Sequence, residues 1–388
     1  MKDVLIITSY FPPETGAASN RIFHLASGLQ QHNFKISVIT PLPNYPTGKI
    51  FKSYRGKFKD TSVEKGITIH RLWVYASISK NKVVRLFAML SYSLSLIWYF
   101  LFHNIPKIVI VQSPPLIVAF TCCTFLRSKR RKLILNVSDL WPIAGLELGA
   151  LKKNFSYSLL ERIESANYKK ADLILGQSEE ILKHIKSLYP NKNTILYRNY
   201  PDFRSPETSI KTEKATPKIK LVYAGLLGIA QGVLKLCQSL NYEPIEFHIY
   251  GAGAEQIKIE NYIKMHPELP IVFHGEVSRD MLHQELITYD LGIIPLLNRI
   301  YGSVPSKIFE YAKLGLPMLY FGGGEGETII SEHHLGWIAK AGDYEDLNKI
   351  LRNIDKSSLN TDLKEKIKST AAIHFDFDKQ LNFLVKQI

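Results

Sequence analysis

The residues best suited to chemistry lie in one stretch, Gly302–Pro317, which follows an apolar segment expected to be a strand. Pro305 fits the first turn of a helix, because proline lacks the N–H that this position leaves unpaired. Ser306 and Lys307 follow at the helix start, where free backbone N–H groups attract anions. Glu310 comes next and could accept hydrogen bonds from sugar hydroxyls. The stretch predicts a phosphate cradle beside a carboxylate or, as the plainer alternative, a capped helix with a solvated glutamate.

Glycine follows four expected strands in the second half of the chain. In open α/β sheets, ligands bind beyond these carboxyl ends, and glycine lets a ligand approach the backbone. Each turn alone is weak evidence for a nucleotide site; Gly251-x-Gly253, for example, lacks the third glycine of a dinucleotide fingerprint. Together the turns predict one nucleotide pocket at a sheet edge. They are Gly225–Gly228, Gly251–Gly253, His274–Glu276 and Gly322–Glu327.

Two features of the first half also fall at strand ends. Tyr10–Arg21 is rich in proline and small residues and leads into a helix ending near Gln31, with Ser19 or Asn20 as its cap. It is either a binding loop or an ordinary connection. Asp139 follows the expected strand Leu133–Val137. This carboxylate is either a binding or catalytic group, or a helix cap.

The elements that position these residues alternate between strand and helix along the whole chain. With 388 residues, two domains of ordinary size are expected. The polar, proline-containing segment Asn199–Lys218 separates two runs of alternation. The predicted fold class is therefore α/β, with two doubly wound, parallel-sheet, Rossmann-like domains. We place them at 1–200 and 201–372, and expect a C-terminal helix, 373–388, to pack back on the first domain.

Two apolar segments stand out, Val83–Phe102 and Leu116–Leu126, and the second runs into the basic segment Arg127–Lys132. The first could be a buried helix, a helix that dips into a membrane surface, or a transmembrane helix. We favour surface association with anionic lipid, since apolar helices with basic flanks suit it. The apolar run Val4–Ile7 is too short for a signal peptide, so we expect a cytoplasmic protein on the inner face of the cytoplasmic membrane.

Net charge and cysteine spacing limit the kinds of partner and metal site that this protein is expected to have. The net charge of +14 suits nucleic acid, an anionic membrane or anionic substrates. Arg127–Lys132 contains no aromatic residue and no DNA-binding motif occurs, so we expect no nucleic-acid partner. Cys122, Cys123 and Cys237 have no metal or disulfide spacing. Asp376-x-Asp378 is not at a strand end, so neither a metal nor a cofactor is expected.

The first group of motifs is Gly16 and Pro305–Lys307 with Glu310-Tyr311, Gly315 and Pro317. With the two-sheet plan, this group resembles family 4 retaining glycosyltransferases of the GT-B fold, whose two domains face a cleft. The second group is Tyr10–Glu14, Arg21, Pro43–Pro46 with Gly48, Asp139–Pro142, and Gly228 with Gln231-Gly232. This group resembles the L-fucosamine transferase branch of bacterial surface polysaccharide synthesis.

The resemblance implies a UDP-linked sugar donor and a lipid-linked (undecaprenyl diphosphate) glycan acceptor. Glu310 would bind the donor ribose, and the loop with Ser306 and Lys307 would hold the diphosphate. Our own candidate for contacting or deprotonating the acceptor hydroxyl is Asp139, followed by Glu14. The donor site would comprise Gly16, Gly225, Gly228, Gln231, Gly251, Gly253, Phe273, Gly275, Val277, Arg299, Pro305, Ser306, Lys307 and Glu310. The acceptor site would comprise Glu14, Arg21, Asn44, Tyr45 and Trp141.

The chain departs from the family pattern at two places. A second glutamate often lies eight positions before Glu310, where this chain has Gly302. An Arg and a Lys often follow the Gly225–Gly228 turn, where this chain has Gln231. We hypothesise that Lys307 and Arg299 neutralise the leaving diphosphate instead. A nucleotide-sugar epimerase of the same plan and an inactive membrane-bound scaffold are the alternatives.

Overall fold

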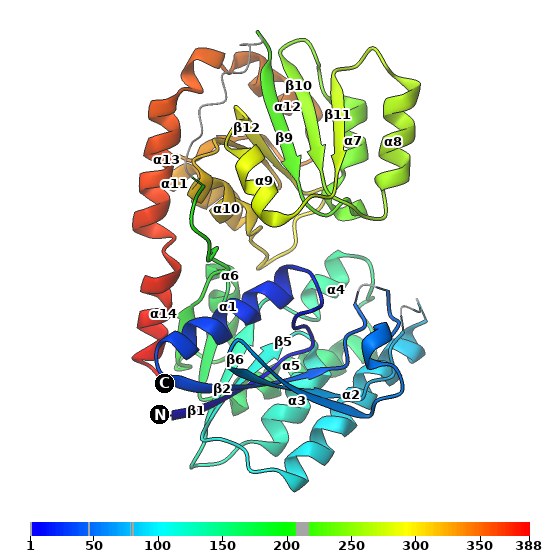
Figure 1. The fold of residues 1–388 in the computed structure, drawn as a ribbon, viewed down its shortest axis with the longest axis vertical. Helices are drawn as coiled ribbons and strands as arrows, with labels where there is room; N and C mark the ends of the chain where they lie inside the picture. Colours follow the sequence, from blue (N-terminus) through cyan, green and yellow to red (C-terminus); the bar gives the residue numbers. More distant parts are fainter. Residues whose placement is uncertain (1, 46, 78, 80, 207–216) are drawn as a thin grey trace. The chain divides into compact units, whose positions relative to one another are not determined.

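The computed structural model describes residues 2–45, 47–77, 79, 81–206 and 217–388. They form two compact units, each built on its own sheet (Figure 1). Unit 1 comprises the chain up to Asn199 together with Tyr301–Ser303 and Asp378–Ile388. Unit 2 comprises Tyr200–Ile300 and Val304–Phe377. The sequence placed these divisions after residues 200 and 372, and residues 207–216 of the expected linker lie outside the described residues.

The sheet of unit 1 has eight strands in the order β3-β4-β2-β1-β5-β6-β7-β8. Its central strands are continuous apolar runs because helices cover both faces, and the side chains of Val4–Ile7 are all buried. All neighbours are parallel except β3 and β4, which form an antiparallel pair. The strands are β1 (Lys2–Ile7), β2 (Phe34–Pro41), β3 (Lys59–Glu64), β4 (Ile67–Leu72), β5 (Ile108–Ser113), β6 (Lys132–Val137), β7 (Leu173–Gly176) and β8 (Thr194–Leu196).

The sequence reading missed β3, because this edge strand is mostly polar and exposed and has no apolar alternation to mark it. The helices of unit 1 are α1 (Ala17–Gln31), α2 (Lys82–Phe102), α3 (Leu116–Phe125), α4 (Ile143–Glu147), α5 (Phe155–Lys170), α6 (Glu179–Leu188) and α14 (Phe377–Val385), of which Phe377 belongs to unit 2. Ser178 caps α6, its side chain accepting from the Ile181 N–H. None of the described helices is long and apolar enough to cross a membrane, α2 included.

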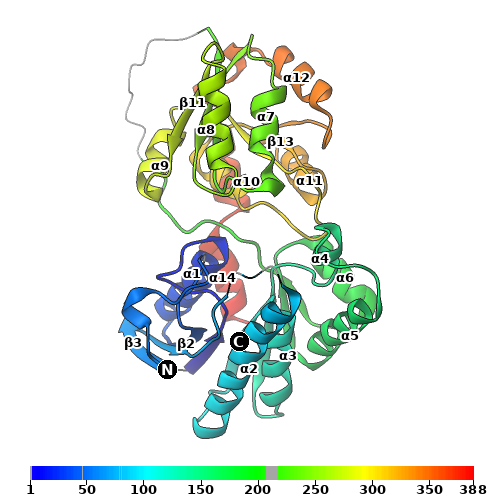
Figure 2. The ribbon, with the colours of Figure 1, turned by 90° about the vertical axis from the view of Figure 1, so that its right-hand side faces the viewer.

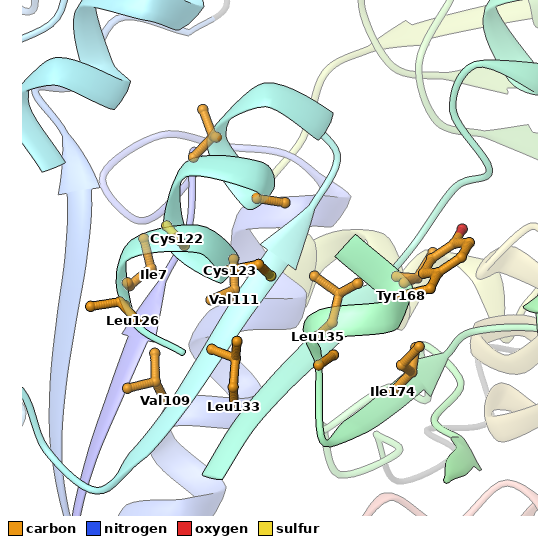
Figure 3. Close-up of a cluster of buried hydrophobic side chains, with 14 of the residues drawn as sticks. Ile7, Val109, Val111, Cys122, Cys123, Leu126, Leu133, Leu135, Tyr168 and Ile174 are labelled. Carbon is orange, nitrogen blue, oxygen red and sulfur yellow. The ribbon is translucent and has the colours of Figure 1, made fainter. Parts of the chain in front are cut away.

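The core of unit 1 explains two of the cysteines. Cys122 and Cys123 of α3 are buried against β5 and β6 beside Leu133 and Leu135 (Figure 3). Burial raises the pKa of the Cys123 thiol to about 12. These thiols are packing residues of the core.

The sheet of unit 2 has six parallel strands in the order β11-β10-β9-β12-β13-β14. The order reverses direction beside β9, which is the switch point where such sheets bind ligands. The strands are β9 (Ile219–Ala224), β10 (Ile245–Tyr250), β11 (Ile271–Gly275), β12 (Leu291–Pro295), β13 (Met318–Phe321) and β14 (Gly336–Ile338). The helices are α7 (Val233–Ser239), α8 (Gln256–Met265), α9 (Arg279–Leu286), α10 (Lys307–Leu314), α11 (Glu325–Glu332), α12 (Tyr344–Asn353) and α13 (Thr361–His374).

Two predicted helix starts are wrong in detail. Gly16, and not Ser19 or Asn20, precedes α1, because the Ser19 hydroxyl is buried and donates to the Glu14 carbonyl. Pro305 lies one residue before the N-cap of α10, Ser306, so it is not in the first turn. The Pro305 carbonyl accepts the Ile308 N–H at 3.2 Å, and this is the first hydrogen bond at the start of the helix.

Candidate functional site

Helix α10 is fixed under the switch point of the unit 2 sheet by its buried face. The Tyr311 hydroxyl accepts the Ala224 N–H at the end of β9 at 3.2 Å. Gly292 of β12 leaves room for the same ring, since a Cβ there would lie 2.7 Å from it. Gly315 ends the helix in the left-handed conformation, which glycine adopts readily. Lys307 and Glu310 lie in the first turn of α10 and are not part of its buried face.

Lys307 reaches the turn after β9. A Cβ added to Gly225 would lie 2.3 Å from the Lys307 ammonium, so this turn must be glycine for the lysine to occupy its place. The ammonium also lies 5.6 Å from the centre of the Tyr223 ring. Desolvation lowers the pKa of Lys307, and the nearby Glu310 carboxylate opposes that shift. A partly buried cation at a strand end is suited to an anionic ligand.

Glu310 is held by two residues of α9 that the sequence reading did not find. Its Oε1 accepts from His283 Nε2 at 2.8 Å and lies 3.8 Å from Arg279 Nε. Burial alone would raise the pKa of Glu310, but the His283 hydrogen bond and the Arg279 charge outweigh it and lower that pKa. Phe203 stacks on the His283 ring at 4.0 Å. The missed signal was the spacing of Arg279 and His283, four apart on one helix.

Three of the four glycine turns, those after β9, β10 and β11, lie against one another. The Gly251 N–H donates to Gly275 O at 2.8 Å, and the Gly225 N–H donates to Tyr250 O at 3.0 Å. A Cβ on Gly251 would lie 1.8 Å from Gly225 O, so the two backbones touch. Gly253 packs on the Leu227 carbonyl in the same way. Three adjacent strands therefore end in a backbone-lined surface beside Lys307.

The other expected donor residues lie around this surface. Arg299 packs against the turn after β13, since a Cβ added to Gly324 would lie 2.9 Å from its Nε. This contact is with that turn and not with Lys307. The Gln231 side chain lies against Gly228 in its own loop, since a Cβ added to Gly228 would lie 2.6 Å from the Gln231 Oε1. That oxygen is buried without a hydrogen-bond partner in the described part of the chain. Lys235 of α7 follows Gln231 and is the first lysine after this turn, but its ammonium lies over the Tyr344 ring, 5.7 Å from the ring centre. Phe273 and Val277 are partly buried against the two cores of unit 2.

In unit 1, Asp139 and Arg21 form a second polar group. Arg21 is 5% exposed, and one of its nitrogens donates to Gln177 Oε1 at 2.8 Å. Its Nε and other terminal nitrogen are buried without a partner among the described residues. Burial lowers the pKa of Arg21 to about 10. Burial likewise raises the pKa of Asp139 to about 6, against the opposing charge of Arg21, which suits a group that exchanges protons near neutral pH.

The other predicted acceptor residues have mainly packing contacts. The buried Glu14 carboxylate accepts the N–H groups of Asn44 and Tyr45 at 2.7 and 2.8 Å, so it holds that loop in place. Tyr45 is half-exposed and would lie 3.7 Å from a Cβ on Gly16. Trp141 packs over Gly145 of α4. Pro46, in the same motif as Asn44, lies outside the described residues.

Gly302 belongs to unit 1 and is tightly packed against its neighbours. Its N–H donates to Glu180 Oε2 at 2.8 Å, and its carbonyl accepts from the Ser178 hydroxyl at 2.7 Å. With φ of +83°, a Cβ there would lie 3.0 Å from Ile181 and 3.1 Å from Leu140. A glutamate would be strained at this position.

Comparisons with known proteins are consistent with this arrangement. One family model, described as a glycosyl transferase 4-like domain, matches residues 16–197, and a second, glycosyl transferases group 1, matches residues 221–355. No curated protein matches the chain. Together the two domains cover most of the sequence and define the class, a glycosyltransferase. The chain belongs to the GT-B glycosyltransferase family that combines these two domains.

Solved structures show the same fold over the whole chain. Sucrose-phosphate synthase from Thermosynechococcus elongatus is 12% identical with a TM-score of 0.78, covering 100% of this chain and 98% of its own. WaaG, a glycosyltransferase involved in lipopolysaccharide biosynthesis, is 14% identical with a TM-score of 0.69, covering 99% of each chain. HepE from Anabaena, in complex with UDP, is 11% identical with a TM-score of 0.67, covering 100% of this chain and 99% of its own. The predicted α/β fold and enzyme class are confirmed.

Proposed function

We propose that this glycosyltransferase transfers a sugar from a UDP-sugar to a lipid-linked glycan acceptor, with retention of the anomeric configuration. The observation that carries the donor half is the placement of Lys307 and Glu310 on the first turn of α10, beside the glycine turns. HepE, which has the same fold, was solved with UDP and with UDP-glucose. That neighbour supports UDP as the nucleotide.

Glu310 is suited to bind the donor ribose. The recorded contacts of its carboxylate within the described part of the chain go to Oε1. Oε2 is therefore left to accept from a ribose hydroxyl. Because its pKa is lowered, the carboxylate is ionised at neutral pH, and hydrogen bonds to a charged acceptor are the stronger ones.

Lys307 would stabilise the departing nucleotide diphosphate. When the sugar–phosphate bond breaks, negative charge develops on the β-phosphate and positive charge on the sugar. A partly buried ammonium beside the Gly225 turn would stabilise that charge without reorganisation. Arg299, in the loop between β12 and α10 and against the turn after β13, would supply a second cation. We infer same-face attack by the acceptor hydroxyl, with Asp139 receiving its proton.

The finer assignment rests on the motif resemblance. We propose an N-acetylated amino or deoxy hexose donor, such as UDP-N-acetyl-L-fucosamine, and an undecaprenyl diphosphate-linked glycan in capsule or O-antigen synthesis. WaaG, of the same fold, is itself involved in lipopolysaccharide biosynthesis. The reaction would occur on the inner face of the cytoplasmic membrane.

The test of the donor site is the variant Glu310→Gln, measured by titration calorimetry with UDP. Loss of a charged hydrogen bond to ribose should weaken UDP binding by about 10- to 100-fold, while the exposed control Glu332→Gln binds as the wild type does. An unchanged dissociation constant in Glu310→Gln would refute the ribose assignment.

Activity is tested with a panel of UDP-sugars, with and without a polyprenyl diphosphate-linked acceptor. A glycosylated lipid and free UDP, formed only when both substrates are present, would support transfer. A new epimeric UDP-sugar formed without acceptor would instead favour the epimerase alternative. No turnover of any donor that binds would favour the scaffold alternative.

A further inference from the structure

Helix α2 has two apolar faces, and only one of them is covered. Tyr92 and Leu96 are buried against the core of unit 1. The opposite face exposes large apolar side chains at helical spacing over the whole length of the helix, with Leu94 66% and Trp98 68% exposed. The exposed residues are Val83, Leu86, Phe87, Leu90, Leu94, Trp98, Leu101 and Phe102. No Asp or Glu occurs in α2. A stripe of this length marks an interaction site rather than ordinary surface.

Helix α3 extends the apolar surface toward a basic pocket. It packs beside α2 (Figure 2), and Phe125 at its end is half-exposed. The segments that follow α2 and α3 both line a pocket of about 890 Å³ at the amino ends of β1, β5 and β6. Its lining residues are Lys2, Asp3, Ile105–Ile108, Ser128–Lys132, Asp172 and Ile388.

Half of the lining cations are already engaged. Arg131 donates to the carbonyls of Ile105, Pro106 and Leu126, and so closes the pocket wall. Lys2 donates to the Ile388 carbonyl at 3.0 Å, and Lys132 donates to the Gln387 carbonyl. The acid Asp172 is engaged as well, accepting the Leu133 N–H at 2.8 Å.

The other three cations are exposed. Lys107, Lys129 and Arg130 make no side-chain hydrogen bond or ion pair with the residues that the structure describes. Asp3 is the remaining acid in the lining. The pocket therefore offers three cations to an anion, at the place where the apolar surface ends.

We propose that this surface docks on an anionic lipid membrane, with a lipid phosphate in the basic pocket and the exposed face of α2 in the interfacial layer. The combination of an apolar stripe and adjoining cations matches the two layers of such a membrane, acyl chains and charged headgroups. Trp98 lies on the stripe, and tryptophan favours this boundary. The pocket is at the amino edge of the sheet, so docking there leaves the carboxyl-edge residue Asp139 uncovered.

The first experiment is flotation of the full chain with phosphatidylglycerol or phosphatidylcholine vesicles. The triple variant Lys107→Gln/Lys129→Gln/Arg130→Gln should bind phosphatidylglycerol vesicles about 100-fold more weakly. The matched control Lys258→Gln/Lys264→Gln/Lys366→Gln removes the same charge from exposed positions of unit 2 and should bind as the wild type does. Equal weakening by both triple variants would overturn the pocket assignment.

The second experiment tests the apolar stripe. Leu94→Ser/Leu101→Ser should reduce binding to phosphatidylglycerol vesicles, while its thermal unfolding and near-ultraviolet circular dichroism stay those of the wild type and so report on the folding of unit 1, which contains α2. Brominated lipids should quench the fluorescence of Trp98 in the wild type, and that component should disappear in Trp98→Phe. Unaltered binding of the serine variant or absence of quenching would overturn insertion.

Two other occupants are distinguished in the same series. Inorganic phosphate or glycerol phosphate is added at millimolar concentration, and both vesicle binding and the melting temperature of the protein are measured. If the small anion releases the protein from the vesicles and raises its melting temperature over the same concentration range, the pocket is a free-phosphate site. If the wild type is a stable dimer in light scattering and Leu94→Ser/Leu101→Ser is a monomer, the stripe is an interface between two copies. Either result would overturn membrane docking.

Discussion

Replacing Asp139 by Asn should make the protein less active and more stable at the same time. Burial raises the pKa of this carboxyl from 3.8 to about 6, even with Arg21 beside it. The folded protein therefore favours the protonated form, which asparagine imitates. The stability gained from this preference is complete below pH 4 and is lost as the pH rises through 6.

The size of the effect follows from that difference. Each pKa unit corresponds to about 1.36 kcal/mol, so ionising Asp139 in the folded protein costs up to about 3 kcal/mol at pH 8. Asp139→Asn should recover much of this at pH 8 and little at pH 4. In a unit of this size, about 3 kcal/mol raises the melting temperature by several degrees.

The assay is thermal unfolding of both proteins across this pH range, together with initial transfer rates. If Asp139 accepts the proton of the acceptor, the Asn variant should lose about 10²- to 10⁴-fold in kcat. In the wild type, kcat should fall below about pH 6 as Asp139 becomes protonated. The control Glu161→Gln, an exposed carboxylate of unit 1, should change neither property.

Two results would refute the reasoning. An Asn variant no more stable at pH 8 than the wild type would show that Asp139 is not held in a desolvated site. A stabilised variant with full activity would confirm the environment of Asp139 but remove its role in proton transfer.

Three further outcomes are expected. Lys307→Met should keep the fold and lower kcat about 100-fold, measured under saturating donor, because it removes the cation placed at the leaving phosphate. His283→Phe should keep the stacking on Phe203 but raise KM for the donor more than it lowers kcat, since it releases Glu310; a purely structural role would predict lower thermal stability with KM unchanged. Gly302→Ala should lower the unfolding free energy by about 1–3 kcal/mol, measured by urea denaturation, because φ is positive there.

The sequence was informative wherever a local pattern determines the structure. Apolar runs such as Val4–Ile7 marked the buried strands, and glycine marked the strand ends that meet at Gly225 and Gly251. Edge strand β3 escaped notice because half-exposed polar residues carry no such pattern. Helix starts were misplaced where a side chain makes a tertiary bond instead of a cap, as Ser19 does with Glu14.

The composition of the candidate site depended on contacts between distant parts of the chain. Nothing near Glu310 in sequence identifies His283, 27 residues earlier, as its partner. Lys307 was singled out from its place at a helix start, but its approach to Gly225 depends on how α10 packs under β9. Glu14 shows the opposite case: its motif suggested a ligand contact, whereas its carboxylate holds the backbone of Asn44 and Tyr45.

The two departures from the family pattern have a physical reading in this structure. Gly302 makes backbone hydrogen bonds to Glu180 and Ser178 and has a positive φ, at which a glutamate would be strained. Lys235 contacts Tyr344, so it does not stand in for the missing cation, whereas Lys307 lies against the Gly225 turn itself. The positive charge at the end of β9 thus comes from α10 rather than from the helix that follows β9. Since Glu310 occupies the same turn of α10, one short helix would hold both the ribose and the phosphate of the donor.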